Sequence, residues 1–111
     1  MLTFREQKYH TLKVCVRGVN PTREISISDI LRNSTKEYGK NVVRMVLDQF
    51  ELTVPDGKHT CLLYQPLGMS FSEFQDLLPG QKFPKEMIQR GTQLILIALA
   101  FMHEHDVIHT G

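Results

Sequence analysis

The chain has 111 residues, of which 41% are hydrophobic and 23% are charged, and its formal net charge is +1. This length and composition are typical of one folded domain with a modest core, and they argue against a fibrous repeat, a disordered tail and a membrane protein. Because basic and acidic residues alternate along the chain, no surface for nucleic acid or anionic lipid is predicted.

The first predicted elements are a strand and a helix. The strand covers Tyr9–Val16, which is rich in apolar and β-branched residues and carries Lys13 in its middle. After a break, Thr22 is predicted to cap a helix whose apolar side chains recur at intervals of three and four. Glu24 falls in the first turn of this helix, and Asn33 is predicted to end it.

A β-hairpin is predicted within residues 42–67. An apolar segment that ends at Leu52 is followed by the turn Pro55–Lys58 and then by the apolar segment Cys61–Tyr64. Proline presets the first torsion angle of such a turn, and Gly57 is predicted to take a left-handed conformation. Two antiparallel strands are therefore expected.

Two further helices are predicted after the hairpin. Ser70 and Glu73 have the spacing of a capping box ahead of a short helix, which Gly80 is placed to stop. A second helix is predicted to start near Pro84, because proline suits a first helical position, and to keep its apolar period to about His103.

The two cysteines, Cys15 and Cys61, each lie in an apolar stretch. Their spacing is not that of metal ligands or of a redox pair, so reduced and buried thiols are predicted. When Lys13 and Tyr64 point to one face of the sheet, strand alternation puts the cysteines on opposite faces. A disulfide between them is therefore not expected.

Two stretches bear on the compartment. The first ten residues, MLTFREQKYH, lack the long apolar core of a secretory signal, so an intracellular location in the cytoplasm or the nucleus is expected. The longest apolar run, Leu94–Met102, is nine residues long, whereas a membrane span needs about 20. We interpret this run as part of a buried helix.

The order of these elements resembles part of a protein kinase. The segment KHTCLLYQPLG, residues Lys58–Gly68, precedes a long helix and the sequence VIHT, and this arrangement is similar to the serine/arginine-rich-protein kinases, particularly their fungal members. The resemblance covers nearly the whole chain. It implies an α+β fold: a partial antiparallel sheet with its helix from the upper lobe over residues 1–67, and the first two helices of the lower lobe with the start of the catalytic loop over residues 68–111.

The resemblance implies roles for two charged side chains. Lys13 matches the strand lysine that holds the nucleotide phosphates, where a fixed cation neutralises the charge of the oxygens. Glu24 matches the helix glutamate that pairs with this lysine and orients it. When the resemblance is set aside, a single lysine on a strand is commonly a residue that only faces solvent. Similarly, a glutamate in a first helical turn gains about 0.3–1 kcal/mol from the helix dipole, whether or not it meets a lysine.

The resemblance also implies a site for ATP and magnesium. Tyr64 falls at the gatekeeper position, and Gln65 and Leu67 offer a backbone carbonyl and a backbone amide to the adenine edge. Pro66 lacks an N–H group, but the family's amide at this position points away from the nucleotide. We identify no metal ligand, and the uneven spacing of the histidines at 103, 105 and 109 leads us to reject a zinc site.

His109 and Thr110 match the opening of the catalytic loop, in which the next residue is the aspartate that accepts the proton of the substrate hydroxyl. Gly111 stands at that position and has no side-chain acceptor. The sequence also contains no glycine-rich loop, metal-binding asparagine or Asp-Phe-Gly segment at the family's positions. We therefore expect a fragment of a serine/threonine kinase without turnover, whose family phosphorylates proteins, in this branch arginine- and serine-rich ones.

Two other hypotheses remain open. The chain could be a non-catalytic, pseudokinase-like interaction module that binds a partner through its kinase-like surface or through the helix around Leu94–Met102. It could also be a small α+β protein whose likeness to kinases is accidental. Apolar residues of the long helix that face water would favour self-association, whereas no nucleic acid and no membrane is expected as a partner.

Overall fold

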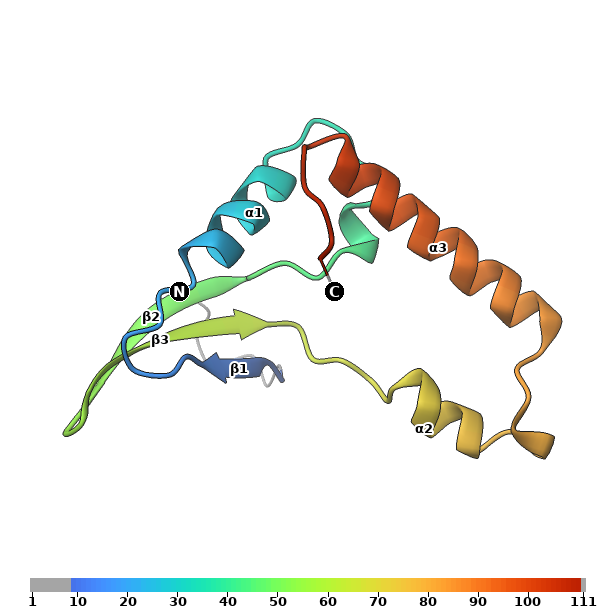
Figure 1. Cartoon of the computed structure of the whole chain (residues 1–111), viewed down its shortest axis with the longest axis horizontal. Helices are drawn as coiled ribbons and strands as arrows, with labels where there is room; N and C mark the ends of the chain where they lie inside the picture. Colours follow the sequence, from blue (N-terminus) through green and yellow to red (C-terminus); the bar gives the residue numbers. More distant parts are fainter. Residues whose placement is uncertain (1–8, 111) are drawn as a thin grey trace. The chain divides into compact units, whose positions relative to one another are not determined.

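The computed structural model describes residues 9–110 of the chain (Figure 1). These residues form two compact units, and each unit is described by itself. The first comprises residues 9–35 and 44–66, and the second comprises residues 36–43 and 67–110. In the described part of the chain, no helix has both the length and the apolar character needed to cross a membrane.

The first unit is an antiparallel sheet with one helix on it (Figure 1). Its elements are, in chain order, β1 (Thr11–Val14), α1 (Thr22–Arg32), β2 (Asp48–Val54) and β3 (Gly57–Tyr64). The strand order is β1–β3–β2, and the register sets Lys13 opposite Leu62. Since directly opposed residues point to the same face and side chains alternate along a strand, Lys13, Leu62 and Tyr64 share one face.

A small core joins α1 to that face. Val46, Leu62 and Tyr64 are buried together, and Ile25 of α1 packs against them. Leu31 near the end of the helix is also buried. The apolar spacing of the helix therefore places its inner side against the centre of the sheet.

The main chain of Val46 anchors the C-terminal half of α1. Its N–H group donates to Ser28 Oγ at 3.0 Å, and its carbonyl oxygen accepts from the guanidinium of Arg32. Ser28 is buried, so its hydroxyl bonds with little competition from water. Both backbone groups of one residue ahead of β2 are thus tied to the helix.

The opposite face of the sheet keeps apolar side chains in contact with water. Four large side chains of β1 and β2 are between 42% and 49% exposed, namely Leu12, Val14, Phe50 and Leu52. Cys61 lies on this face opposite Val14 and is nevertheless fully buried. Cys15 lies on the other face, and both cysteines are free thiols.

The second unit is helical. Its elements are, in chain order, the 3₁₀ turn η2 (Lys40–Val42), α2 (Phe71–Asp76), the 3₁₀ turn η3 (Pro79–Gln81) and α3 (Lys85–His103). The capping box predicted for α2 is present: Glu73 N–H donates to Ser70 Oγ, and Ser70 N–H donates to the Glu73 carboxylate. Phe83 packs against α2, with its ring 5.8 Å from that of Phe71.

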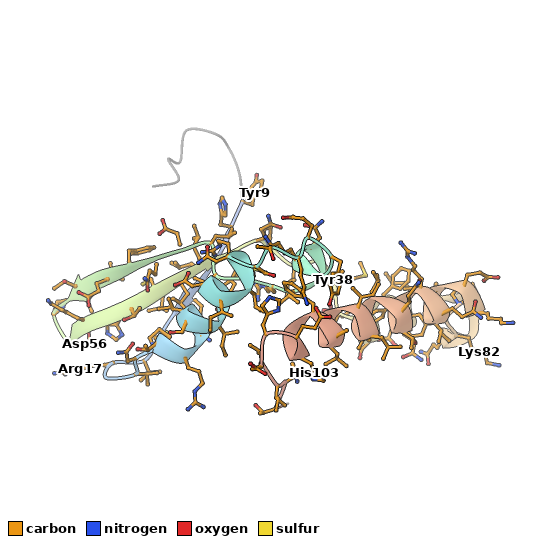
Figure 2. All side chains as sticks on the ribbon, turned by 90° about the horizontal axis from the view of Figure 1, so that it is seen from above. Tyr9, Arg17, Tyr38, Asp56, Lys82 and His103 are labelled. Carbon is orange, nitrogen blue, oxygen red and sulfur yellow. The ribbon has the colours of Figure 1, made fainter. Side chains whose placement is uncertain are left out.

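The C-terminal end of α3 is fixed by the segment around η2. Phe101 is fully buried, and the ring of Tyr38 meets it edge-on at 5.8 Å. Figure 2 shows Tyr38 beside the end of the helix. Glu104 accepts hydrogen bonds from Tyr38 and, at 2.8 Å, from Lys36. Segment 36–43 therefore packs as part of the second unit.

The start and middle of α3 are less covered. Ile88, Ile95 and Leu96 are 55%, 58% and 60% exposed. The interpretation of the apolar run 94–102 as part of a buried helix therefore holds for Phe101 but is wrong for Ile95 and Leu96. The apolar positions expected to face the core, Met87, Ile88, Leu94, Ile95, Ala98, Leu99 and Met102, left out Phe101, although Phe101 is the one fully buried residue of α3 within the described chain.

Several predicted boundaries were wrong by a few residues. β1 is shorter than 9–16. Thr22 is the first helical residue, and Pro21 occupies the N-cap position without a side-chain hydrogen bond. Pro84 is likewise the N-cap residue of α3 and not its first helical residue. In each case the proline lies one position before the helix, because its preset φ suits that place as well as the first turn.

Two glycines show how the turn signals worked out. Gly57 has a positive φ of +134°, as predicted, and it is the first residue of β3, after a two-residue turn. Gly80 does not stop α2, which ends at Asp76. The physical reason is Pro79, which disfavours the helical conformation for the residue before it; Leu78 has a ψ of 146°.

His59 links the hairpin turn to the end of β1. Its Nδ1 lies 3.0 Å from the carbonyl oxygen of Cys15, and its Nε2 lies 3.3 Å from a carboxylate oxygen of Asp56. Figure 2 shows Asp56 and Arg17 at the same end of this unit. Both ring nitrogens face acceptors, so only the doubly protonated ring donates to both. The Cys15 carbonyl, followed by Asp56, raises the pKa of His59, while the charge of Arg17 opposes this effect.

This geometry predicts a pH-dependent stability. Because the folded pKa of His59 is above its unfolded value, its contribution is fully present below about pH 6.5 and is lost as the pH rises through the folded pKa. The replacement His59→Gln should flatten this part of the urea-unfolding profile between about pH 6 and pH 8. The control His10→Gln, just before β1, should keep it. A wild-type profile that rises over this range would contradict the assignment.

A second prediction concerns Gly39. Its φ is +84°, and an added Cβ would lie 2.5 Å from Cβ of Phe101. Gly80 has a similar φ of +65° with nothing near it, so Gly80→Ala tests backbone strain alone and should cost about 1–2 kcal/mol. Gly39→Ala should cost about 1–3 kcal/mol more, because it also overpacks the core. Urea unfolding of the two variants measures the difference in the free energy of unfolding. Equal losses of stability would show that the side chain of Phe101 moves aside without cost.

Candidate functional site

The side chain of Lys13 meets that of Glu24 between the sheet and α1. Lys13 lies in the middle of β1 on the helix side, and Glu24 lies in the first turn of α1. Nζ of Lys13 is 2.8 Å from Oε2 of Glu24. The side chains are 52% and 39% exposed, so the ammonium group remains accessible to a ligand from solvent.

The other carboxylate oxygen of Glu24 accepts a hydrogen bond from the phenol of Tyr64. Tyr64 is the last residue of β3, and its side chain is buried in the core. Glu24 therefore bridges the half-exposed ammonium group of Lys13 and the hydroxyl of the buried Tyr64. Burial, followed by the hydrogen bond to Glu24, raises the pKa of Tyr64, so the phenol stays protonated and acts as the donor.

The charge state of Glu24 results from opposing effects. Burial acts to raise the pKa of the Glu24 carboxyl, but the hydrogen bonds from Lys13 and Tyr64, together with the charges of Lys13 and Arg44, outweigh it. The net effect lowers the pKa of Glu24 below its ordinary value. The carboxylate is therefore ionised at neutral pH and can hold a cation.

Arg44 adds a cation above Tyr64. Its guanidinium carbon lies 4.5 Å from the centroid of the Tyr64 ring, and its Nη2 donates to the carbonyl oxygen of Gln65 at 3.2 Å. Neither a role for Arg44 nor the hydrogen bond between Tyr64 and Glu24 was predicted from the sequence. The only sequence signal for a role of Arg44 was that it is a single basic residue within the apolar segment that leads into β2.

The connector after β3 is exposed at each of Gln65, Pro66 and Leu67. Gln65 belongs to the first unit, together with Lys13, Glu24 and Tyr64, whereas Leu67 belongs to the second. All three residues are therefore in contact with solvent. The roles of these residues in adenine binding stay predictions.

His109 lies in the second unit, in the irregular segment after α3, and is exposed. Gly111, predicted to stand at the place of a catalytic aspartate, lies outside the described residues. Among residues 9–110, no group of three or more His, Cys, Asp and Glu side chains is arranged to hold a metal ion.

An open hollow of about 380 Å³ lies elsewhere in the first unit, between the start of α1 and the hairpin. Its lining residues are Asn20, Ile25, Gln49, Phe50, Glu51 and Thr60. They include neither Lys13 nor the connector. The site is therefore defined by converging polar groups and not by this hollow.

Sequence comparisons identify what this arrangement belongs to. The chain is 35% identical over 107 residues, 95% of its length, to a serine/threonine protein kinase of Aspergillus fumigatus, of which it spans 27%. It is 30% identical over 89% of its length to protein kinase dsk1 of Schizosaccharomyces pombe, spanning 19% of that protein. It is 33% identical over 86% of its length to the serine/threonine-protein kinase SRPK of Physarum polycephalum, spanning 24%. No protein-family model matches the chain.

These relatives define a class of phosphotransferases. The chain belongs to the serine/threonine protein kinase family, and it corresponds to one segment of such a protein. It spans between about a fifth and a quarter of the length of the curated relatives it matches. The α+β architecture of the structure agrees with the fold class expected from the sequence.

The Glu24 bridge predicts a stability effect that depends on acid. Glu24→Gln keeps the shape but removes the charge, and because the pair with Lys13 is partly exposed, it should cost about 0.2–1 kcal/mol at pH 7. The folded pKa of Glu24 is below its unfolded value, so this contribution is present above the unfolded pKa and disappears as the pH falls through the folded pKa.

Urea unfolding at pH 7 and at about pH 3 measures the effect, because the two proteins should differ less in acid. Glu37→Gln, at a glutamate that is 86% exposed and lies 3.4 Å from Lys40, is the matched control and should show little loss. A difference between wild type and Glu24→Gln that is equal at both pH values would contradict the lowered pKa.

Proposed function

We propose that the chain is the nucleotide-binding segment of an ATP-dependent serine/threonine protein kinase. In this proposal residues 1–67 correspond to part of the upper lobe, and residues 68–111 to the first helices of the lower lobe. The observation that carries the proposal is the 2.8 Å contact between Lys13 and Glu24 in a chain whose relatives are named as kinases.

The chemistry of phosphoryl transfer gives this pair its role. The transferred phosphoryl group carries negative charge on its oxygens, and catalysis depends on positioning and neutralising that charge. A half-exposed ammonium can reach the phosphates of a bound nucleotide, while Glu24 limits the rotamers of an otherwise flexible side chain. Lys13 would bind the phosphates, and Glu24 would position Lys13.

The connector supplies the proposed contacts to the base. The carbonyl oxygen of Gln65 would accept from the amino group of adenine, and the N–H group of Leu67 would donate to the ring. Pro66 lacks an N–H group and loses nothing by facing away. The exposure of all three residues supports this part of the proposal.

Turnover is a separate question from binding. The resemblance gives His109 the opening of the catalytic loop, and Gly111 stands where the proton-accepting aspartate is expected. Glycine cannot accept the proton of a substrate hydroxyl, so we propose that this polypeptide binds nucleotide without transferring phosphate. For the complete family members, the implied substrates are proteins rich in arginine and serine.

A second candidate function is that of a non-catalytic interaction module. The observation that favours it is the exposure of Ile88, Ile95 and Leu96 along α3. Side chains spaced by seven and eight residues lie on one side of a helix, and an exposed apolar stripe is typical of a surface that associates. This candidate needs neither Lys13 nor a nucleotide.

Mg-ATP binding separates the two candidates. At ten times its Kd, a ligand stabilises a protein by about 1.4 kcal/mol, which corresponds to a rise in Tm of roughly 5 °C for a domain of this size. Lys13→Ala should abolish the rise. Lys58→Ala, at a lysine of β3 whose side chain is 70% exposed, is the matched control and should retain it. No rise in the wild-type chain, or an equal rise in Lys13→Ala, would favour the interaction module.

A further inference from the structure

The Lys13–Glu24 pair is part of a longer series of contacts. From the carboxylate of Glu24, the series continues through the phenol of Tyr64 to the guanidinium of Arg44 and ends at the carbonyl of Gln65. Every member belongs to the first unit. The series joins the two ends of the proposed nucleotide site, namely the cation for the phosphates and the carbonyl for the base.

We propose that Tyr64 and Arg44 are positioning residues that hold the Glu24 carboxylate and the Gln65 carbonyl in place before any nucleotide binds. We call these two side chains the brace. The proposal rests on the proposed function, since it assigns the brace to that same site. It gives a positioning role to Tyr64, which the sequence predicted only as the gatekeeper, and to Arg44, which the sequence left without a role.

The Tyr64 half of the brace follows from burial and bonding. The side chain is buried at the end of β3, between the core and α1, so the position of its hydroxyl is fixed. That hydroxyl donates to the oxygen of Glu24 that Lys13 does not use. When Lys13 turns toward a phosphate, Glu24 therefore keeps a bond to the sheet, and α1 stays attached.

The Arg44 half follows from the shape of the guanidinium group. A planar cation can stack on a ring and donate in its own plane at the same time, which an ammonium group cannot do. Arg44 does both, at 4.5 Å from the Tyr64 ring centroid and 3.2 Å from the Gln65 oxygen. A carbonyl oxygen has two lone pairs, so the bond from Arg44 leaves one for an amino group and fixes the direction in which it points.

The groups that lower the pKa of Glu24 come from three parts of the unit. Lys13 approaches from β1, Arg44 from the segment ahead of β2, and the neutral phenol of Tyr64 from β3. Each of them favours the ionised carboxylate. Removal of any one of these three side chains should therefore raise the pKa of Glu24, and this change can be followed without a nucleotide.

The first experiment follows the Glu24 carboxyl carbon by NMR during a pH titration of the nucleotide-free chain. Tyr64→Phe removes one hydroxyl and keeps the ring, so the pKa of Glu24 should move up toward that of an ordinary glutamate, and the amides of α1 should exchange faster. Tyr38→Phe is the matched control, because Tyr38 makes the same kind of bond to Glu104 in the second unit, and it should leave Glu24 unchanged. An unchanged titration in Tyr64→Phe would overturn the brace.

The second experiment measures Mg-ATP affinity by calorimetry. Tyr64→Phe should weaken binding by about three- to tenfold, the effect of one positioning hydrogen bond, with no change in Tyr38→Phe. Arg44→Gln should weaken binding by a similar factor and also raise the pKa of Glu24. Arg44→Lys keeps the charge without the planar group, so it should resemble wild type in the titration and Arg44→Gln in affinity.

The outcomes separate the brace from the proposed function. A raised Glu24 pKa in Tyr64→Phe with full Mg-ATP affinity would overturn the positioning role while leaving the nucleotide site intact. Wild-type affinity in Arg44→Lys would overturn the part assigned to Arg44. Failure of the wild-type chain to bind Mg-ATP would overturn the proposed function, and the titration and the exchange of α1 would then decide the brace alone.

Discussion

The carboxylate of Glu24 connects the helix of the first unit to two strands of its sheet. One oxygen bonds to Lys13 on β1 and the other to Tyr64 on β3. An isolated, partly exposed ion pair contributes little to stability, and the fold does not depend on it energetically. Its importance lies in geometry, since two bonds in different directions fix the position of a carboxylate that one bond would leave free to turn.

The apolar contacts make this geometry possible. Val46, Leu62 and Tyr64 form the core under α1, and the antiparallel register puts Lys13 beside Leu62 on the same face. Lys13 is thus set at the rim of a small apolar core, and its side chain is 52% exposed, so its ammonium group reaches the surface. What distinguishes Lys13 from an ordinary solvated strand lysine is its partner, because an ionised glutamate lies 2.8 Å from its Nζ.

Much of this arrangement could be predicted from the sequence because its signals are local. The Pro-Asp-Gly turn and the spacing of Ser70 and Glu73 each specify a hydrogen-bonding pattern over a few residues. The contact between Lys13 and Glu24 followed from the order of the elements and the kinase likeness. Arg44 could not be predicted in this way, because it meets Gln65, 21 residues later, from an irregular segment without periodicity.

Phe101 was missed for a different reason. The run 94–102 is almost continuously apolar, so periodicity alone cannot tell which side of α3 becomes buried. The choice is made by Tyr38 and Gly39, which pack on Phe101 from a segment far away in the sequence. The left-handed conformation of Gly39 brings the backbone close enough to cover the ring.

The two hydrogen bonds between the backbone of Val46 and α1 have a mechanical consequence. Ser28 and Arg32 bond to both backbone groups of Val46. These bonds couple α1 to the segment that leads into β2, so we expect the two to move together. Arg44 lies two residues before Val46 and donates a hydrogen bond to the carbonyl oxygen of Gln65. In the proposed nucleotide site, a rotation of α1 would therefore act on the carbonyl group assigned to the base as well as on the carboxylate that holds Lys13.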